Sequence, residues 1–190
     1  FGVPRQAGLI PELEGRIVFE PEYRVAEALR GLEGYSHLWL IWVFSEVEMQ
    51  KSSMGTDTWS PTVRPPRLGG NKRMGVFATR SPFRPNPIGL SCVEIAGIDF
   101  DASDGPVILV KGADLMNGTP IPAIKPYLPF TDSRPYARGG FTNQTYTQKP
   151  LEVVIPEEFY TLYNLKEEQW TALHKVLGQD PRPHYHHDEQ

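Results

Sequence analysis

Residues 36–47 read SHLWLIWVFSEV and contain the longest apolar run of the chain, residues 38–44. Drawn as an extended strand, this run carries apolar side chains on both faces, which is typical of a strand buried on both sides. Ser45 and Glu46 end the run, where the chain must return to solvent. The run is far too short to cross a membrane. We therefore predict a buried strand here, the clearest strand of the chain.

Shorter patterns on either side predict a domain rich in β-structure. Strands are expected at residues 15–20, 74–79, 88–100, 107–112 and 151–155, with an extended segment at 124–130. Helices are expected at residues 25–32, at 156–163, and from a capping box at 164–167 to about 177, where Gly178 ends the helix. Gly97 marks a β-bulge. Short strands with proline and glycine turns, then helices, indicate a β-rich α+β fold: a barrel or a sandwich with helical additions.

The composition fits one domain with at most a small appendage. The chain has 190 residues, a formal net charge of -4 and 19 prolines, a share that favours many turns and short elements. We expect residues 1–150 to form the main domain and residues 151–190 a truncated C-terminal part with a strand, helices and a tail. The chain starts with Phe1 rather than Met, so we expect its natural start to be missing.

A single cysteine, Cys92, excludes an intramolecular disulfide and fits a reducing compartment. We interpret Cys92 as a small buried hydrophobe rather than a nucleophile, since no histidine or second cysteine is near it in sequence. No signal peptide is visible, so we expect a soluble cytoplasmic protein.

Positive charge is concentrated in residues 58–93, TWSPTVRPPRLGGNKRMGVFATRSPFRPNPIGLSCV, which contain no Asp or Glu although the chain is acidic. Guanidinium groups donate several fixed hydrogen bonds to phosphates and carboxylates, and stiff proline-rich loops on a scaffold suit a binding site. A solvated surface with proline-rich turns is the alternative. The charge pattern favours a site for a polyanion. The basic residues of the run are Arg64, Arg67, Lys72, Arg73, Arg80 and Arg84.

Several common chemistries are absent from the sequence. It has no GxGxxG after a strand, no P-loop, no GxSxG elbow, no HExxH and no CxxC. Residues 184–190, HYHHDEQ, could bind a metal on composition alone, but we interpret them as a frayed or truncated tail and expect no metal site. An enzyme built on this chain must therefore position its groups on a less common scaffold.

Five stretches together resemble one family: VPRQAGL (3–9), GYSHLWLIWVF (34–44), TVRPPRLGGNKRMGVFATRSPFRPNPIGLS (62–91), DLMNGTPIPAIKPYLPF (114–130) and QDPRP (179–183). They are similar to the TsaA-like or TrmO proteins. These are S-adenosylmethionine-dependent methyltransferases that modify N6 of threonylcarbamoyladenosine at position 37 of the tRNA anticodon loop. The resemblance implies a small β-barrel distinct from the Rossmann fold, a homodimer, S-adenosylmethionine as cofactor and tRNA as partner.

The resemblance also implies a set of cofactor-binding residues. Family members commonly carry Asp where this chain has Asn117, which puts any role of that carboxylate in question here. Turn amides and Arg80 can bind a carboxylate, and Glu46 can accept hydrogen bonds from ribose hydroxyls. The residues carried over are Gln6, Ala7, Gly8, Leu9, Ser45, Glu46, Arg80, Leu90, Gly118, Thr119, Pro120 and Ile121.

The reaction would need a base for the N6 proton and a surface for the nucleic acid. Asp114 is the first candidate general base and Asp132 the second. Arg64, Arg67, Lys72, Arg73 and Arg84 are candidates for tRNA phosphates, and Tyr127 or Phe83 for stacking on a splayed base. Two other interpretations stay open: a non-catalytic RNA-binding barrel, which would not bind the methyl donor, and a methyltransferase for a small molecule, which would not bind tRNA.

Overall fold

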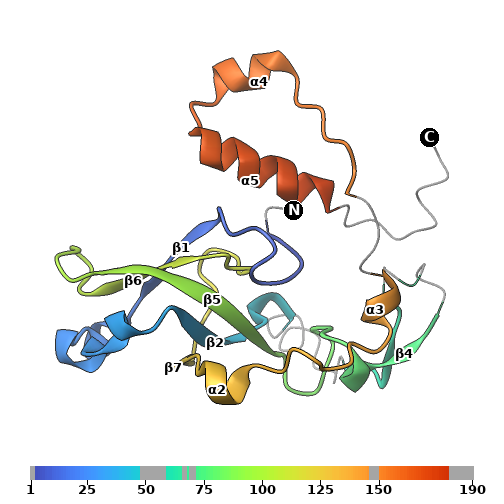
Figure 1. Cartoon of the computed structure of the whole chain (residues 1–190), viewed down its shortest axis with the longest axis horizontal. Helices are drawn as coiled ribbons and strands as arrows, with labels where there is room; N and C mark the ends of the chain where they lie inside the picture. The colour runs from blue at the N-terminus through green and yellow to red at the C-terminus, as the bar shows by residue number, and fades with distance from the viewer. Residues whose placement is uncertain (1–2, 48–58, 66–67, 69–71, 146–149, 180–190) are drawn as a thin grey trace.

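The computed structural model describes residues 3–47, 59–65, 68, 72–145 and 150–179, and its centre is a five-stranded antiparallel sheet (Figure 1). The β-rich α+β class is therefore confirmed. The described strands pair as an open sheet with β1 and β7 at its edges, so closure into a barrel stays a prediction. The strand order is β1 (Glu14–Val18), β6 (Val107–Lys111), β5 (Ile88–Asp99), β2 (His37–Val43), β7 (Ala123–Pro126).

The longest strand, β5, pairs with two neighbouring strands. It pairs with β2 along residues 88–94 and with β6 along residues 94–99. The register to β6 shifts between Ile95 and Gly97, so the expected bulge at Gly97 is confirmed. A bulge bends the strand and increases its twist, which allows β5 to leave one neighbour and join another.

The main core cluster is formed by side chains of β1, β2, β5 and β6, with one residue from the 3-10 turns that precede β2. Along β2, Leu38 and Leu40 are fully buried, whereas Trp39, Ile41 and Val43 on the other face are half-buried. Burial on both sides is therefore only partial, because Trp39 and Val43 border the cavity described below. The other buried members of the main cluster are Ile17, Leu29, Val93, Ile108 and Val110.

The predicted helix at residues 25–32 is wrong. Two 3-10 turns, η2 (Ala26–Leu29) and η3 (Leu32–Gly34), stand there instead. So short a segment makes too few backbone hydrogen bonds to offset the cost of helix nucleation. Gly31, at φ 85°, separates the two turns with a left-handed conformation that glycine adopts readily.

Two predicted strands are also shorter or missing. At residues 74–79, β4 (Met74–Gly75) pairs only with β3 (Thr62–Val63), and a 3-10 turn η5 (Val76–Ala78) follows. Thr79 closes this turn, because its N–H and its hydroxyl both donate to the carbonyl of Val76, at 3.1 and 2.8 Å. Residues 151–155 form no strand. The Leu151 N–H donates instead to the carbonyl of Gly178 at 2.9 Å, at the end of the last helix.

The helices whose bounds lie within the described residues are α2 (Pro129–Asp132), α3 (Thr142–Thr145), α4 (Glu157–Leu162) and α5 (Glu167–Gly178). The helices expected at 156–163 and up to Gly178 are confirmed. The capping box lies two residues later than predicted, since the Gln169 side chain accepts a hydrogen bond of 2.9 Å from the Lys166 N–H. No helix in the described part of the chain is long and apolar enough to cross a membrane.

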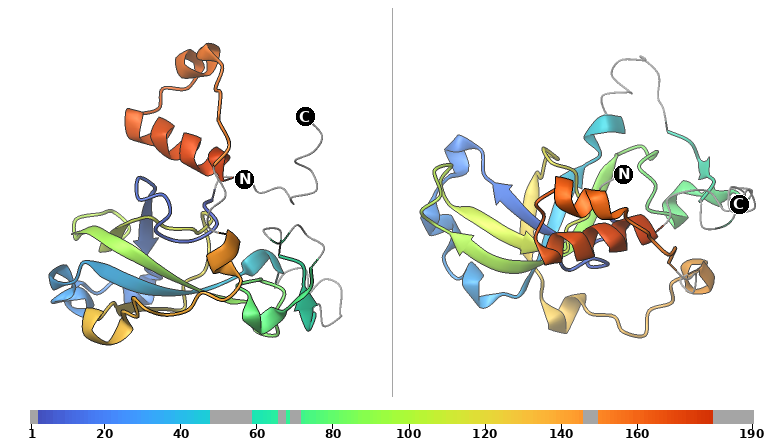
Figure 2. Two further views of the ribbon diagram at one scale, coloured as in Figure 1. Left: turned by 45° about the vertical axis from the view of Figure 1, so that its right-hand side comes forward. Right: turned by 90° about the horizontal axis from the view of Figure 1, so that it is seen from above.

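The helix α5 lies against the N-terminal loop, on the side of the sheet where that loop runs (Figures 1 and 2). The Arg5 N–H donates to Gln179 Oε1 at 2.9 Å, immediately after the helix. Lys175 forms an ion pair with Glu12. The C-terminal part is thus attached to the loop that carries one of the predicted cofactor motifs.

Candidate active site

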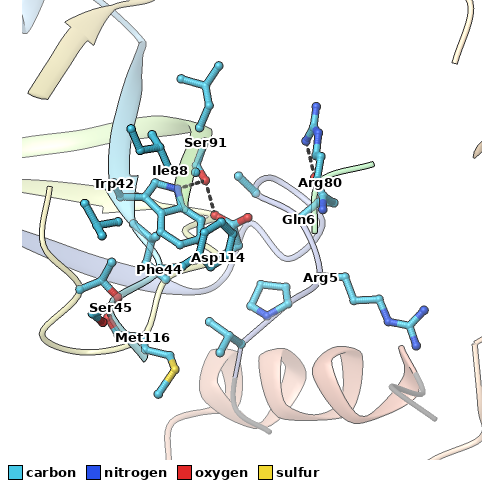
Figure 3. Close-up of a pocket in the computed structure, with 18 of the residues that line it drawn as sticks. Arg5, Gln6, Trp42, Phe44, Ser45, Arg80, Ile88, Ser91, Asp114 and Met116 are labelled. Carbon is cyan, nitrogen blue, oxygen red and sulfur yellow. Dashed lines mark hydrogen bonds between the residues drawn. The ribbon is translucent and has the colours of Figure 1, made fainter. Parts of the chain in front are cut away.

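A cavity of about 670 Å³ opens where the end of β2 meets the start of β5 (Figure 3). Its walls come from the N-terminal loop, from β2 and the turn after it, from residues 80–92, and from the segment after β6. Its volume lies within the range of about 300–1,000 Å³ that small-molecule sites occupy. The fold therefore brings four distant sequence segments to one site.

The cavity gathers most of the residues predicted to bind a cofactor. Gly8, Leu9, Gly118, Pro120 and Ile121 are not among the lining residues. Two of these make backbone hydrogen bonds to other segments. The Gly8 N–H donates to the Gly112 carbonyl at 2.8 Å, and the Pro120 carbonyl accepts from the Val43 N–H at 3.1 Å. The predicted residues that line the cavity are Gln6, Ala7, Ser45, Glu46, Arg80, Leu90 and Thr119.

A chain of hydrogen bonds runs along one wall, from Trp42 through Ser91 to Asp114 (Figure 3). The indole Nε1 of Trp42 donates to Ser91 Oγ at 2.9 Å. Ser91 Oγ donates to Asp114 Oδ1 at 2.5 Å. Asp114, the first candidate base, therefore lines the cavity and is held by a side chain from β5.

Gly89 makes room for Trp42 in this wall. The two residues lie opposite each other in the β2–β5 ladder. A Cβ atom at Gly89 would lie 2.2 Å from the indole ring, a distance at which neither group could stay in place. The indole therefore lies over a bare backbone position, and the ring of Phe44 stands 4.3 Å from it, centroid to centroid, at 58°.

On another side of the cavity, Arg80 and Gln6 lie next to each other (Figure 3). Arg80 Nη1 donates to Gln6 Oε1, which joins the loop after η5 to the N-terminal loop. Arg80 is exposed, and its guanidinium carries further donors beside the one that Gln6 uses. Arg5 also lines this side of the cavity. The lining thus carries guanidinium groups, from Arg80 and Arg5, and carboxylates, from Asp114 and Glu46.

The second candidate base, Asp132, does not line the cavity, and its hydrogen bonds give it a structural role. Its Oδ2 accepts hydrogen bonds from Leu128 N–H at 3.0 Å and from Trp39 Nε1 at 2.8 Å. These two donors, with the charge of Arg134, lower the pKa of Asp132 from its ordinary value despite some desolvation. Asp132 therefore fixes Trp39, which does line the cavity.

Cys92 is half-buried and also lines the cavity. Burial, and secondarily the charge of Asp132, raise the pKa of its thiol. The thiol is therefore held in its protonated form, which agrees with the interpretation of Cys92 as a hydrophobe and not a nucleophile.

The predicted tRNA contacts are spread over one end of the molecule. Arg64, Lys72 and Arg73 are exposed around β3 and β4, and Arg73 Nη1 donates to Thr62 Oγ1 at 2.8 Å. Arg67 lies outside the described residues, as do residues 184–190. Arg84 lines the cavity, and its Nη2 also donates to the carbonyls of Val76 and Thr79.

The two candidate stacking residues differ in exposure. Phe83 is 46% exposed. Tyr127 is half-buried, with its ring 5.7 Å from that of Trp39 and 6.1 Å from that of His37. No cluster of three or more metal-ligating side chains occurs within the described ranges.

Sequence reasoning missed several residues of the site, among them Trp42, Phe44, Ser91 and Met116. A signal for Ser91 was present: it is a hydroxyl residue in the otherwise apolar start of the strand predicted at residues 88–100. Such a residue needs a hydrogen-bond partner. The partner, Asp114, lies 23 positions further along the chain, so only the strand register reveals the pair.

Comparisons with known proteins identify relatives of this chain. The family model of the tRNA-methyltransferase O N-terminal domain matches residues 1–133. The tRNA (adenine(37)-N6)-methyltransferase of Escherichia coli K12 is 42% identical over 193 residues, covering 100% of this chain and 79% of that protein. The protein of the same name from Eikenella corrodens is 44% identical over 151 residues, covering 80% of this chain and 79% of that one.

A solved structure gives the same result for the fold. The crystal structure of TrmO from Pseudomonas aeruginosa superposes with a TM-score of 0.66 at 31% identity, covering 96% of this chain and 74% of that one. Together these matches place the chain among the tRNA methyltransferases. Within that class, the chain belongs to the TrmO family, as its motifs predict.

Proposed function

We propose that the protein transfers a methyl group from S-adenosylmethionine to N6 of threonylcarbamoyladenosine at position 37 of tRNA. The observation that carries this proposal is one cavity of cofactor size that holds both the carboxylate of Asp114 and the guanidinium of Arg80. Membership of the TrmO family supports the tRNA and the methyl donor. The threonylcarbamoyl group is inferred from the family resemblance.

The residues of the cavity fit S-adenosylmethionine. Arg80 suits the carboxylate of the methionine part, and Glu46 suits ribose hydroxyls or an ammonium group. The rings of Trp42 and Phe44 offer π-faces that favour an adenine ring or a sulfonium cation. When bound, the cofactor supplies an electrophilic methyl group.

The chain's own contribution is to position the acceptor and take its proton. N6 of a carbamoylated adenosine is a poor nucleophile, because its lone pair is delocalised into the carbamoyl group. Its proton must leave, and Asp114 is the general base that the cavity offers. Asp132 is the weaker candidate, because Leu128 and Trp39 already occupy its Oδ2.

The nucleic acid would reach the cavity from the end of the molecule that carries β3 and β4. We propose that Arg64, Arg67, Lys72, Arg73 and Arg84 contact tRNA phosphates, and that Tyr127 or Phe83 stacks on the splayed base. Arg84 supports this direction of approach because it both lines the cavity and belongs to the basic run.

A homodimer is proposed on the family resemblance, with support from two apolar side chains at the cavity. Ile88 and Leu90 are 49% and 54% exposed although they begin the central strand β5 and line the cavity. A second copy that covers them would complete the site. Sedimentation of the protein at micromolar concentration measures this: a monomer with full activity would contradict it.

The deciding experiment is transfer of labelled methyl from S-adenosylmethionine to bulk tRNA prepared with and without the threonylcarbamoyl group. We expect label only in the carbamoylated tRNA, and Asp114→Asn to lose about 100-fold or more in kcat with little change in cofactor affinity. Transfer to both tRNAs would remove the threonylcarbamoyl group from the substrate definition. Absence of cofactor binding in calorimetry would leave an RNA-binding protein as the better account.

A further inference from the structure

The hydrogen bonds between Trp42, Ser91 and Asp114 can run in only one direction. An indole N–H donates and never accepts, so Ser91 Oγ must be the acceptor of the 2.9 Å bond from Trp42. The hydroxyl of Ser91 has one proton, and Asp114 Oδ1 lies 2.5 Å from its oxygen. Ser91 therefore donates that proton to Asp114, and Asp114 Oδ1 accepts it.

Ser91 is buried, so its hydroxyl depends on these two hydrogen-bond partners. Ser91 is 2% exposed, the one buried polar residue in the described part of the chain. A buried hydroxyl without partners is unfavourable, so Trp42 and Asp114 satisfy a group that is almost fully buried. A hydroxyl that donates to a carboxylate makes a short, charge-assisted bond, which agrees with the 2.5 Å separation.

We propose that Ser91 is a positioning residue for the reaction, an inference that rests on the proposed function. Trp42 fixes the orientation of the Ser91 hydroxyl, and the hydroxyl holds one oxygen of Asp114 as an acceptor. The second oxygen of Asp114 is then presented to the acceptor nitrogen. In the transfer step, the N6–H bond breaks and its proton goes to Asp114, while the bond from N6 to the methyl carbon forms and the sulfur–methyl bond breaks.

Ser91→Ala tests the proposal, because it removes the hydroxyl but adds no bulk. We expect kcat to fall about 100-fold, with KM for tRNA and the dissociation constant of S-adenosylhomocysteine within about threefold of the wild type. Ser91→Thr keeps the hydroxyl and should restore most of kcat. Trp42→Phe keeps a ring and leaves the Ser91 hydroxyl able to donate, so its loss in kcat should be smaller. Ser103→Ala, an exposed serine in the turn after β5, is the control without effect.

A double-mutant cycle decides whether Ser91 acts through Asp114. If it does, Ser91→Ala adds no further loss of kcat on top of Asp114→Asn. Additive losses, or a wild-type kcat in Ser91→Ala, would overturn the proposal. A folding defect would lower the affinity for S-adenosylhomocysteine in every Ser91 variant, Ser91→Thr included, and this outcome would also overturn it.

A spectroscopic measurement separates this inference from the proposed function. The indole N–H of Trp42, assigned in the NMR spectrum by its absence in Trp42→Phe, should shift and exchange faster in Ser91→Ala, because it loses its acceptor. This signal needs no turnover. If the wild type transfers no methyl group but the indole responds, the function fails and the hydrogen-bonded arrangement stands; an unchanged indole signal contradicts the arrangement itself.

Discussion

Gly89 is the residue at which the shape of the cavity depends most directly on the absence of a side chain. Gly89→Ala would place a Cβ atom 2.2 Å from the indole of Trp42. We expect the indole to be displaced, at a cost of about 1–3 kcal/mol in the free energy of unfolding, as for other overpacked sites. Affinity for S-adenosylhomocysteine should fall as well, because Trp42 lines the cavity. Urea unfolding and calorimetry measure the two effects.

Gly97→Ala is the matched control on the same strand. A Cβ atom at Gly97 meets nothing within 4 Å, so this variant should be as stable as the wild type or slightly more stable. Equal destabilisation at both positions would show that strand flexibility, and not contact with the indole, governs Gly89.

Individual residues of the site could be predicted where a motif carried them. Gln6, Arg80 and Glu46 belong to recognisable stretches, and the structure brings them to one cavity. Ser91 and Trp42 could not be assigned in this way, because their roles depend on which strand positions face each other. That register is a property of the folded sheet.

At the scale of elements, the contact between α5 and the N-terminal loop should respond to acid. The ion pair with Lys175 lowers the pKa of Glu12, so Glu12 stabilises the fold above its ordinary value of 4.5 and loses this contribution as the pH falls below it. Lys175→Met should therefore destabilise the protein by up to about 1 kcal/mol at pH 7 and by less at pH 3.5. Thermal unfolding at both pH values measures the difference.

Arg30→Met provides the comparison for this ion pair. Arg30 pairs with Glu27, but their side chains are 77% and 63% exposed, against 46% and 25% for Lys175 and Glu12. Exposed pairs contribute little, so Arg30→Met should leave the midpoint temperature unchanged. An equal effect in both variants would mean that net charge, and not the contact of α5 with the loop, determines the result.

Elements with a long pattern were predicted well, and short segments gave mixed results. The strands β2 and β5 and the helix α5 have sustained patterns and were recognised, and the five-residue strand β6 was recognised as well. Residues 25–32, 74–79 and 151–155 are brief segments whose structure is decided by other parts of the chain, such as the carbonyl of Gly178 that receives Leu151 N–H. Tertiary contacts override local propensity at such places.

At the scale of the whole molecule, basic residues at the two ends should differ in their effect on tRNA binding. The basic residues around β3 and β4 lie at one end, and the turns that carry Arg30 lie at the opposite end (Figure 1). Arg64→Glu with Arg73→Glu should weaken tRNA binding and reduce the slope of log Kd against log salt by about 1 for each phosphate that the protein no longer neutralises. Filter binding at several salt concentrations measures both.

Arg30→Glu makes the same change of charge per residue at the far end. It should leave both affinity and slope close to those of the wild type. If all three positions behave alike, the attraction reflects net charge, and the end with β3 and β4 is not the tRNA-binding surface.

The four separate segments of the cavity also have a kinetic consequence. Arg80 reaches Gln6 across 74 residues and Trp42 reaches Ser91 across 49, so these loops must close before the cavity exists. We expect a pocket assembled from such distant parts to be completed after the main folding barrier. S-adenosylhomocysteine should then lengthen the lifetime of the folded protein in denaturant and leave the refolding rate unchanged. The bound ligand would then slow the unfolding of the native protein, although it would play no part in the folding of the chain.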